Sequence, residues 1–263
     1  MSREIIHFAH ANGFPAKTYS KLFSYLENDF EINYLPRHAH NPKFPVTNNW
    51  ERLRDELREE IEKRYTQKII GVGHSLGGIL HFLVAVEKPE LYKAIILLDA
   101  PLISRLSGTG VKLLKKINLM DKYTPSRQTR FRRANWENKA QALKHFQQKE
   151  KFARFDADVL KDYIEHGTVE AGNYIKLFFD PKIEAEIYRS LPDSFAKFRG
   201  KLKIPAAYIG GTDSQEARMA RLSFMRNNFS FDFKFLEGSH LFPLEKPKET
   251  ADIIKLIVNQ IIS

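Results

Sequence analysis

The chain has 263 residues, no cysteine, and a formal charge of +10 from 42 Lys and Arg against 32 Asp and Glu. The absence of cysteine excludes disulfides, thiolate metal sites, iron–sulfur clusters and a cysteine nucleophile. No apolar run is long enough to cross a membrane, and the first residues lack the basic and apolar regions of a secretory signal. We therefore expect a cytoplasmic protein with a substantial buried core.

The surplus positive charge is confined to one segment. Residues 102–205 contain 22 Lys and Arg and 12 Asp and Glu, whereas the rest of the chain is balanced. The same segment interrupts an alternation of strands and helices that runs through the remainder of the sequence. We therefore predict a core made of residues 1–101 and 206–263, with residues 102–205 inserted as a helical cap.

Short apolar runs predict six strands in the core, at residues 4–9, 30–35, 68–73, 94–99, 206–210 and 231–236. Apolar residues at helical spacing predict core helices at 49–65, 76–87 and 248–262, and cap helices at 112–120, 137–148, 158–165 and 181–189. Alternating strands and helices require crossover connections. The sequence thus predicts an α/β fold with a mostly parallel sheet of about six strands flanked by helices.

The third predicted strand runs into Gly73-His74-Ser75-Leu76-Gly77, a G-x-S-x-G sequence followed by a strongly apolar helix. A serine on such a sharp strand-to-helix turn has a strained backbone that only small neighbours tolerate. The turn places the Ser75 hydroxyl at the carboxyl end of the sheet, where the helix N-terminus offers N–H groups to an oxyanion. We predict Ser75 as a nucleophile and the Leu76 amide as an oxyanion donor.

A serine nucleophile needs a base, and the base needs a carboxylate that fixes its tautomer. His240 follows the last predicted strand and is the candidate base. Asp213 follows the fifth strand and Asp99 ends the fourth. We favour Asp213, because its loop neighbours that of His240, and interpret Asp99 as a hydrogen-bonding strand cap. The order Ser75, Asp213, His240 is the order that the serine motif predicts.

A second oxyanion donor is expected from the loop after the first strand, His10-Ala11-Asn12-Gly13-Phe14-Pro15. Its small residues let the backbone approach a substrate oxygen. We predict the Asn12 amide as the donor, with Gly13 as the alternative, and expect His10 to brace the loop.

Together these motifs resemble the α/β-hydrolase family, in particular its serine esterases and lipases with a helical cap. The resemblance covers residues 4–100 and 204–262 and implies a triad of Ser75, His240 and Asp213. It implies cleavage of a small-molecule ester with an apolar portion, through an acyl-enzyme and without a cofactor or a metal. One departure is structural: no room precedes Glu4 for the family's first two antiparallel strands, which implies six strands, all parallel.

Other activities remain open at this point. A C–C bond hydrolase, a thioesterase or a cofactor-free perhydrolase would use the same triad, and a non-catalytic ligand-binding protein could retain the same fold. His38 and His40 lack a nearby carboxylate in the sequence and are interpreted as a polar loop instead of a metal site.

The basic run in the cap comprises Arg127, Arg130, Arg132 and Arg133. A solvated face is the favoured interpretation. Attraction of an anionic substrate is an alternative, and contact with a membrane surface is less favoured. No nucleic-acid-binding motif accompanies the charge, so we expect no nucleic-acid partner.

Overall fold

A six-stranded parallel sheet forms the centre of the protein. The computed structural model describes residues 3–262. The strands are β1 (Glu4–Ala9), β2 (Phe30–Tyr34), β3 (Ile69–His74), β4 (Tyr92–Leu98), β8 (Ala206–Gly211) and β9 (Phe231–Leu236). They lie in the order β2-β1-β3-β4-β8-β9, and every neighbouring pair is parallel. The predicted six-stranded parallel sheet is confirmed.

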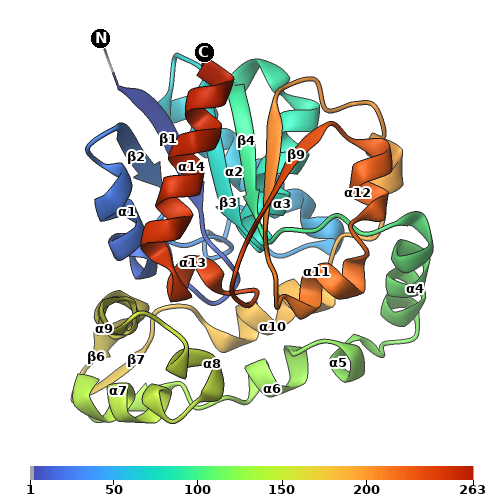
Figure 1. The fold of residues 1–263 in the computed structure, drawn as a ribbon. Coiled ribbons are helices and arrows are strands. Elements are labelled where there is room, and N and C mark those ends of the chain that lie inside the picture. Colours follow the sequence, from blue (N-terminus) through green and yellow to red (C-terminus); the bar gives the residue numbers. More distant parts are fainter. Residues whose placement is uncertain (1–2, 263) are drawn as a thin grey trace.

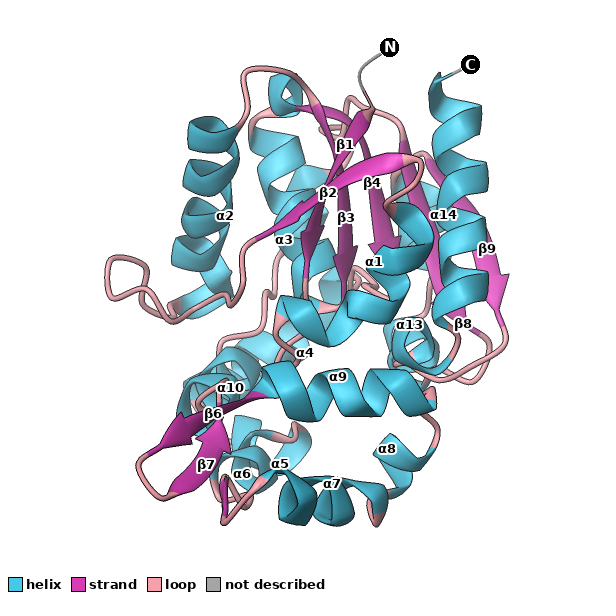
Figure 2. Cartoon of the chain, turned by 90° about the vertical axis from the view of Figure 1, so that its left-hand side faces the viewer, coloured by secondary structure: helices cyan, strands magenta, loops and turns pink. Residues whose placement is uncertain are grey.

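Helices cover both faces of this sheet, which explains why the four inner strands, β1, β3, β4 and β8, are buried at nearly every position. Figure 2 shows α2 (Glu51–Arg64) and α3 (Leu76–Glu87) on one side and α1 (Ser20–Leu26) and α14 (Pro247–Ile262) on the other. Successive residues of a strand face opposite sides. In β1, accordingly, Ile6 joins the cluster under α1 and α14, whereas Ile5 joins the cluster under α2 and α3.

Shorter helices complete the core. They are α11 (Gln215–Ala220), α12 (Ser223–Asn228) and α13 (Phe242–Glu245), together with the 3-10 helices η1 (Ala16–Tyr19), η2 (Asn48–Trp50) and η3 (Pro89–Leu91). A further 3-10 helix, η4 (Phe195–Phe198), belongs to the inserted segment. Helices α11 and α12 connect β8 to β9, and α13 lies between β9 and α14. None of the helices that the structure describes is both long and apolar enough to cross a bilayer.

The inserted segment, residues 102–205, lies across the carboxyl ends of the strands, drawn from green to yellow in Figure 1. Its helices are α4 (Arg105–Lys116), α5 (Met120–Tyr123), α6 (Ser126–Arg130), α7 (Lys139–Gln147), α8 (Glu150–Ala153), α9 (Ala157–Gly167) and α10 (Pro181–Arg189). It also contains a small antiparallel sheet of β5 (Asn135–Trp136), β7 (Tyr174–Leu177) and β6 (Thr168–Ala171). The segment is therefore mainly, but not wholly, helical.

The hairpin of β6 and β7 is not among the elements predicted from the sequence, although the sequence contains a pattern that is typical of a hairpin turn. Gly172 and Asn173 join the two strands, and Gly172 has a φ of 73°. A glycine followed by a polar residue between β-branched and aromatic residues is typical of a tight hairpin. Ile175 and Leu177 alternate with exposed residues along β7 and pack into the core cluster.

Several histidines are buried in the core and have no contact with solvent. Burial lowers the pKa of His7 and His10 well below 6.5, and it lowers the pKa of His74 and of His81 to about 3. These side chains are therefore neutral in the folded protein near neutral pH. In the unfolded chain the same imidazoles take up protons below about pH 6.5.

We predict that the free energy of unfolding falls as the pH is lowered from about 7 to about 5, because the unfolded state then binds more protons. Each buried histidine contributes up to ~1.4 kcal/mol per pH unit in this range. His240 has a raised pKa in the folded protein, so its protonation stabilises the folded state at low pH and offsets the effect of one buried histidine. Urea unfolding at several pH values measures how the free energy of unfolding depends on pH. His81→Gln should make this dependence weaker, because it removes one buried histidine. A stability that stays constant between these pH values contradicts the prediction.

Candidate active site

Ser75 lies on the sharp turn between β3 and α3, as its sequence context predicts. Its backbone has φ 51° and ψ −112°, a strained conformation for a residue with a side chain. The Ser75 amide donates to the Leu98 carbonyl at 2.9 Å. A Cβ on Gly73 would lie 2.4 Å from the carbonyl carbon of Gly77, so the turn requires glycine there.

His240 lies between Ser75 and a buried carboxylate. The Ser75 hydroxyl donates to His240 Nε2 at 3.0 Å, and His240 Nδ1 donates to Asp99 Oδ2 at 2.7 Å. The His240 side chain is 19% exposed, whereas that of Asp99 is completely buried. Serine, imidazole and carboxylate thus form one continuous line of hydrogen bonds, in which the carboxylate fixes the imidazole tautomer.

Asp99 is held in place by groups from the next strand and its loop. Asp99 Oδ1 accepts from the Gly211 amide at 3.0 Å and from the Tyr208 hydroxyl at 3.3 Å. Asp99 Oδ2 accepts from Ser214 Oγ at 2.5 Å as well as from His240. These donors compensate an ionised carboxylate for the water that burial removes.

Asp213 does not occupy the predicted position, and the structure corrects this expectation. Its side chain is 55% exposed, and its carboxylate pairs with Arg154 at 3.4 Å, whereas His240 is hydrogen-bonded to Asp99. The physical reason is the strand order. Strand β4 lies directly beside β3, so Asp99 at its end is next to the serine turn, while β8 lies one strand further away.

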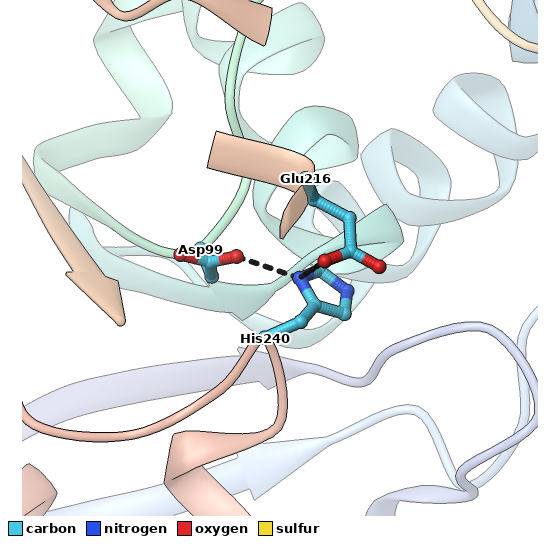
Figure 3. Close-up of side chains that lie close together, drawn as sticks. All are labelled: Asp99, Glu216 and His240. Atoms are coloured by element: carbon cyan, nitrogen blue, oxygen red, sulfur yellow. Dashed lines mark hydrogen bonds and ion pairs between the residues drawn. The ribbon is translucent and has the colours of Figure 1, made fainter. Parts of the chain in front are cut away.

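Glu216 is a second carboxylate near His240, and the sequence does not predict it. Glu216 lies in α11, and its Oε2 atom is 3.9 Å from His240 Nδ1. Figure 3 shows Asp99 and Glu216 on either side of the ring nitrogen. Burial by itself would lower the pKa of His240, but the hydrogen bond to Asp99 and the charges of Glu216 and Asp99 raise it above its usual 6.5.

Leu76 and Asn12, which the sequence predicts as oxyanion donors, lie at the start of α3 and in the loop after β1. Leu76 is the first residue of α3, where helical N–H groups have no acceptor within the helix. Asn12 is buried in the loop after β1, and its side-chain amide donates to the Glu184 carbonyl at 3.0 Å. His10 braces this loop, since its Nδ1 donates to the Ala11 carbonyl and its Nε2 accepts from the His38 amide.

The inserted segment places a charged pair over the same loop. Arg132 is ion-paired with Glu184 of α10, and a Cβ on Gly13 would lie 2.6 Å from Glu184 Oε1. Gly13 has a φ of 81°, so both its conformation and its neighbour favour glycine. Burial raises the pKa of Glu184, while the charges of Arg132 and Lys151 oppose this. Arg132 is therefore not part of a solvated basic face.

Two groups of neighbouring residues contain side chains of the kinds that bind metal ions. Asp99, Glu216 and His240 have ligand atoms within 4.8 Å of one another, but the facing atoms of Asp99 and His240 are already hydrogen-bonded to each other. His40 Nδ1 donates to the His38 carbonyl, and His40 Nε2 accepts from the Asp180 amide. The facing atoms of Asp99 and His240 and both ring nitrogens of His40 are thus already engaged in hydrogen bonds within the protein.

Residues 8–253 match the model of the alpha/beta hydrolase family. The chain belongs to the α/β-hydrolase family. The arrangement of sheet, serine turn and histidine loop described above is thus that of an α/β-hydrolase.

Known proteins of this family resemble the chain over most of its length. An abhydrolase domain-containing protein of Alternaria alternata, AKT2, is 26% identical over 227 residues, which cover 72% of this chain and 82% of the relative. The solved structure of E-2-(acetamidomethylene)succinate hydrolase matches with a TM-score of 0.76 and 17% identity, covering 98% of this chain and 92% of the other. A thioesterase domain from the curacin biosynthetic pathway matches with a TM-score of 0.69 and 14% identity, covering 97% and 91%. At these identities the solved structures support the fold.

The contact between Glu216 and His240 yields a prediction that does not depend on any substrate. Replacing Glu216 by Gln removes a negative charge at 3.9 Å from His240 Nδ1 and should therefore lower the pKa of His240. Titration of the histidine ring signals by NMR measures this pKa. Asp213→Asn is the matched control, because it removes a carboxylate just before α11 that pairs with Arg154 and not with His240. An equal shift of the His240 pKa in both variants contradicts the prediction.

Proposed function

We propose that the protein is a serine hydrolase that cleaves a carboxylic ester of a small molecule through an acyl-enzyme. The observation that carries the proposal is the unbroken line of hydrogen bonds from Ser75 Oγ through His240 to Asp99. A serine hydroxyl within 3.0 Å of an imidazole that a buried carboxylate orients is an activated nucleophile.

In the proposed mechanism, Ser75 Oγ attacks the ester carbonyl carbon while His240 Nε2 takes the hydroxyl proton. Asp99 stabilises the imidazolium that forms. The tetrahedral intermediate collapses, and His240 gives its proton to the departing alcohol, which leaves an acyl group on Ser75. Water then attacks the acyl group with His240 as base, and the acid is released with Ser75 restored.

The negative oxygen of the intermediate needs donors that are already in place. We assign the amide of Leu76 as the first donor, because it lies directly after Ser75 and at the start of α3. We assign the amide of Asn12 as the second, with Gly13 as the alternative in the same loop. The hydrogen bond from the Asn12 side chain to Glu184 supports this assignment, because it holds the loop in one conformation.

An aromatic cluster next to the oxyanion loop supports a substrate with an apolar portion. The ring of Phe14 lies 6.1 Å from that of Phe152, 6.0 Å from that of Phe155 and 5.6 Å from that of Tyr163. Phe14 belongs to the core and the other three to the inserted segment. We therefore assign residues 102–205 the role of a cap, whose aromatic side chains cover the acyl or alcohol part of the substrate.

The same residues would also cleave a thioester or a C–C bond, and they leave a cofactor-free perhydrolase open as well. Matched oxygen and sulfur esters with one acyl group distinguish ester cleavage from thioester cleavage by their kcat/KM. A non-catalytic binding protein would have no need of the Ser75–His240 contact.

The nucleophile can be tested without knowledge of the substrate. A fluorophosphonate probe should label Ser75, and Ser75→Ala should abolish labelling and lower kcat for a p-nitrophenyl ester at least ~10³-fold. Peptide mass spectrometry locates the label. Absence of labelling in the folded protein contradicts the proposal and favours a binding protein.

The choice of acid gives a further prediction. Asp99→Asn should lower kcat by orders of magnitude, approaching the ~10⁴-fold loss that the equivalent Asp-to-Asn change causes in serine proteases, because the amide favours the wrong His240 tautomer. Asp213→Asn should leave kcat nearly unchanged, because the Asp213 side chain faces solvent and Arg154. Thermal melting of both variants controls for misfolding. If Asp213→Asn has the larger effect on kcat, the assignment of Asp99 is wrong.

A further inference from the structure

Helix α4 of the inserted segment exposes a row of large apolar side chains. Leu106, Leu113 and Ile117, just after the helix, are 81%, 56% and 48% exposed. Their spacing of seven and then four residues places them on one face. The opposite face is used for packing, since Gly108 lies against the Asp193 backbone and Lys115 pairs with Asp193. The apolar row is therefore not the side that holds α4 to the protein.

A row of cations runs beside this apolar row. Arg105, Lys112 and Lys116 each precede one of the three apolar residues, so they have the same spacing and lie on the adjacent face of the helix. All three are exposed. Within residues 3–262, no carboxylate lies within ion-pair distance of any of them.

The same pattern continues after α4. Leu119, Tyr123 and Phe131 are exposed, and Phe131 is 77% exposed. Lys122 lies over the Tyr123 ring at 6.0 Å, and Arg130 lies over the Phe131 ring at 5.8 Å. Between residues 105 and 133 there are nine basic residues and one acidic residue, Asp121, which Arg189 already binds.

We propose that α4, α5, α6 and Phe131 form a surface that binds the headgroup region of an anionic lipid bilayer. Figure 1 shows the three helices following one another along the outer edge of the inserted segment. Apolar side chains reach the boundary of the acyl chains, and the cations beside them contact lipid phosphates. We call this set of residues, 105–131, the interfacial surface.

Charge decides between the candidate occupants of the interfacial surface. A second copy of the chain would bring two strongly basic faces together, which is unfavourable. A protein interface concentrates apolar residues in a core from which charged residues are depleted. Here each of Leu106, Leu113 and Ile117 directly follows a cation. This mixture of charged and apolar side chains is typical of a surface that binds the headgroup region of a bilayer. Such binding attaches the protein to the membrane surface without insertion across it. The residues involved are separate from Ser75, His240 and Asp99.

Sedimentation with vesicles tests the proposal directly. We expect the protein to bind vesicles of phosphatidylcholine with about 30% phosphatidylglycerol, and not vesicles of phosphatidylcholine alone. Binding should weaken as salt rises from ~0.01 M to ~0.1 M, because the Debye length falls from ~30 Å to ~10 Å. Equal binding to both vesicles, or to neither, overturns the proposal.

Three variants separate the interfacial surface from overall charge. Leu106→Gln with Leu113→Gln and Ile117→Gln should reduce binding at least ~10-fold without changing the net charge. Arg105→Gln with Lys112→Gln and Lys116→Gln should do the same. The matched control removes three charges elsewhere in the inserted segment, through Lys144→Gln, Lys149→Gln and Lys176→Gln, and should bind nearly as well as the original protein.

Two results would place the binding elsewhere. If the control variant loses as much binding as the variant of Arg105, Lys112 and Lys116, overall charge and not this surface is responsible. If the apolar variant binds vesicles normally but abolishes a concentration-dependent dimer, the apolar row is an interface between copies. Thermal melting of each variant confirms that it is folded, so failure of the proposed hydrolase activity does not affect the vesicle measurement.

Discussion

Helix α3 begins so close to strand β1 that a methyl group on Gly77 would lie 2.0 Å from the Ala9 carbonyl oxygen. This approach fixes where the helix starts, and the strained Ser75 turn follows from it. Because Ser75 is held against the end of β4 through the Leu98 carbonyl, Asp99 is brought to the same place by the sheet itself. The geometry of the site therefore depends on packing between backbone atoms that only glycine permits.

The sequence was sufficient for features that are local. Apolar runs predicted the six strands. The glycines around Ser75 and the position of His240 after the last strand predicted that these two side chains lie together at the carboxyl end of the sheet. The carboxylate next to His240 was predicted to be Asp213 and is Asp99, because its position depends on the strand order, which places β4 between β3 and β8. Glu216 had no distinguishing signal, since only folding brings α11 to within reach of His240. The hairpin at Gly172 did carry a signal, which the helical composition around it obscured.

The charge of the inserted segment divides into two kinds of residue, although the composition makes them look alike. Lys115, Arg132 and Arg189 reach inward and pair with Asp193, Glu184 and Asp121. Arg105, Lys112 and Lys116 remain in solvent beside apolar neighbours. A net charge counts both kinds equally. Tertiary pairing alone shows which cations are available to another molecule, and these lie on the outer edge of the segment.

The hydrogen bond from Asn12 to the Glu184 carbonyl joins the loop after β1 to helix α10 of the inserted segment. Glu184 also contacts Gly13 and pairs with Arg132, so one residue ties the loop to two parts of that segment. If α10 swings outward, it must either break this tie or pull the loop with it. A molecule could then not enter past α10 while the loop after β1 keeps its present conformation. Return of α10 to its position over the strands would restore that conformation, so one movement of α10 would control both access and the arrangement of the loop.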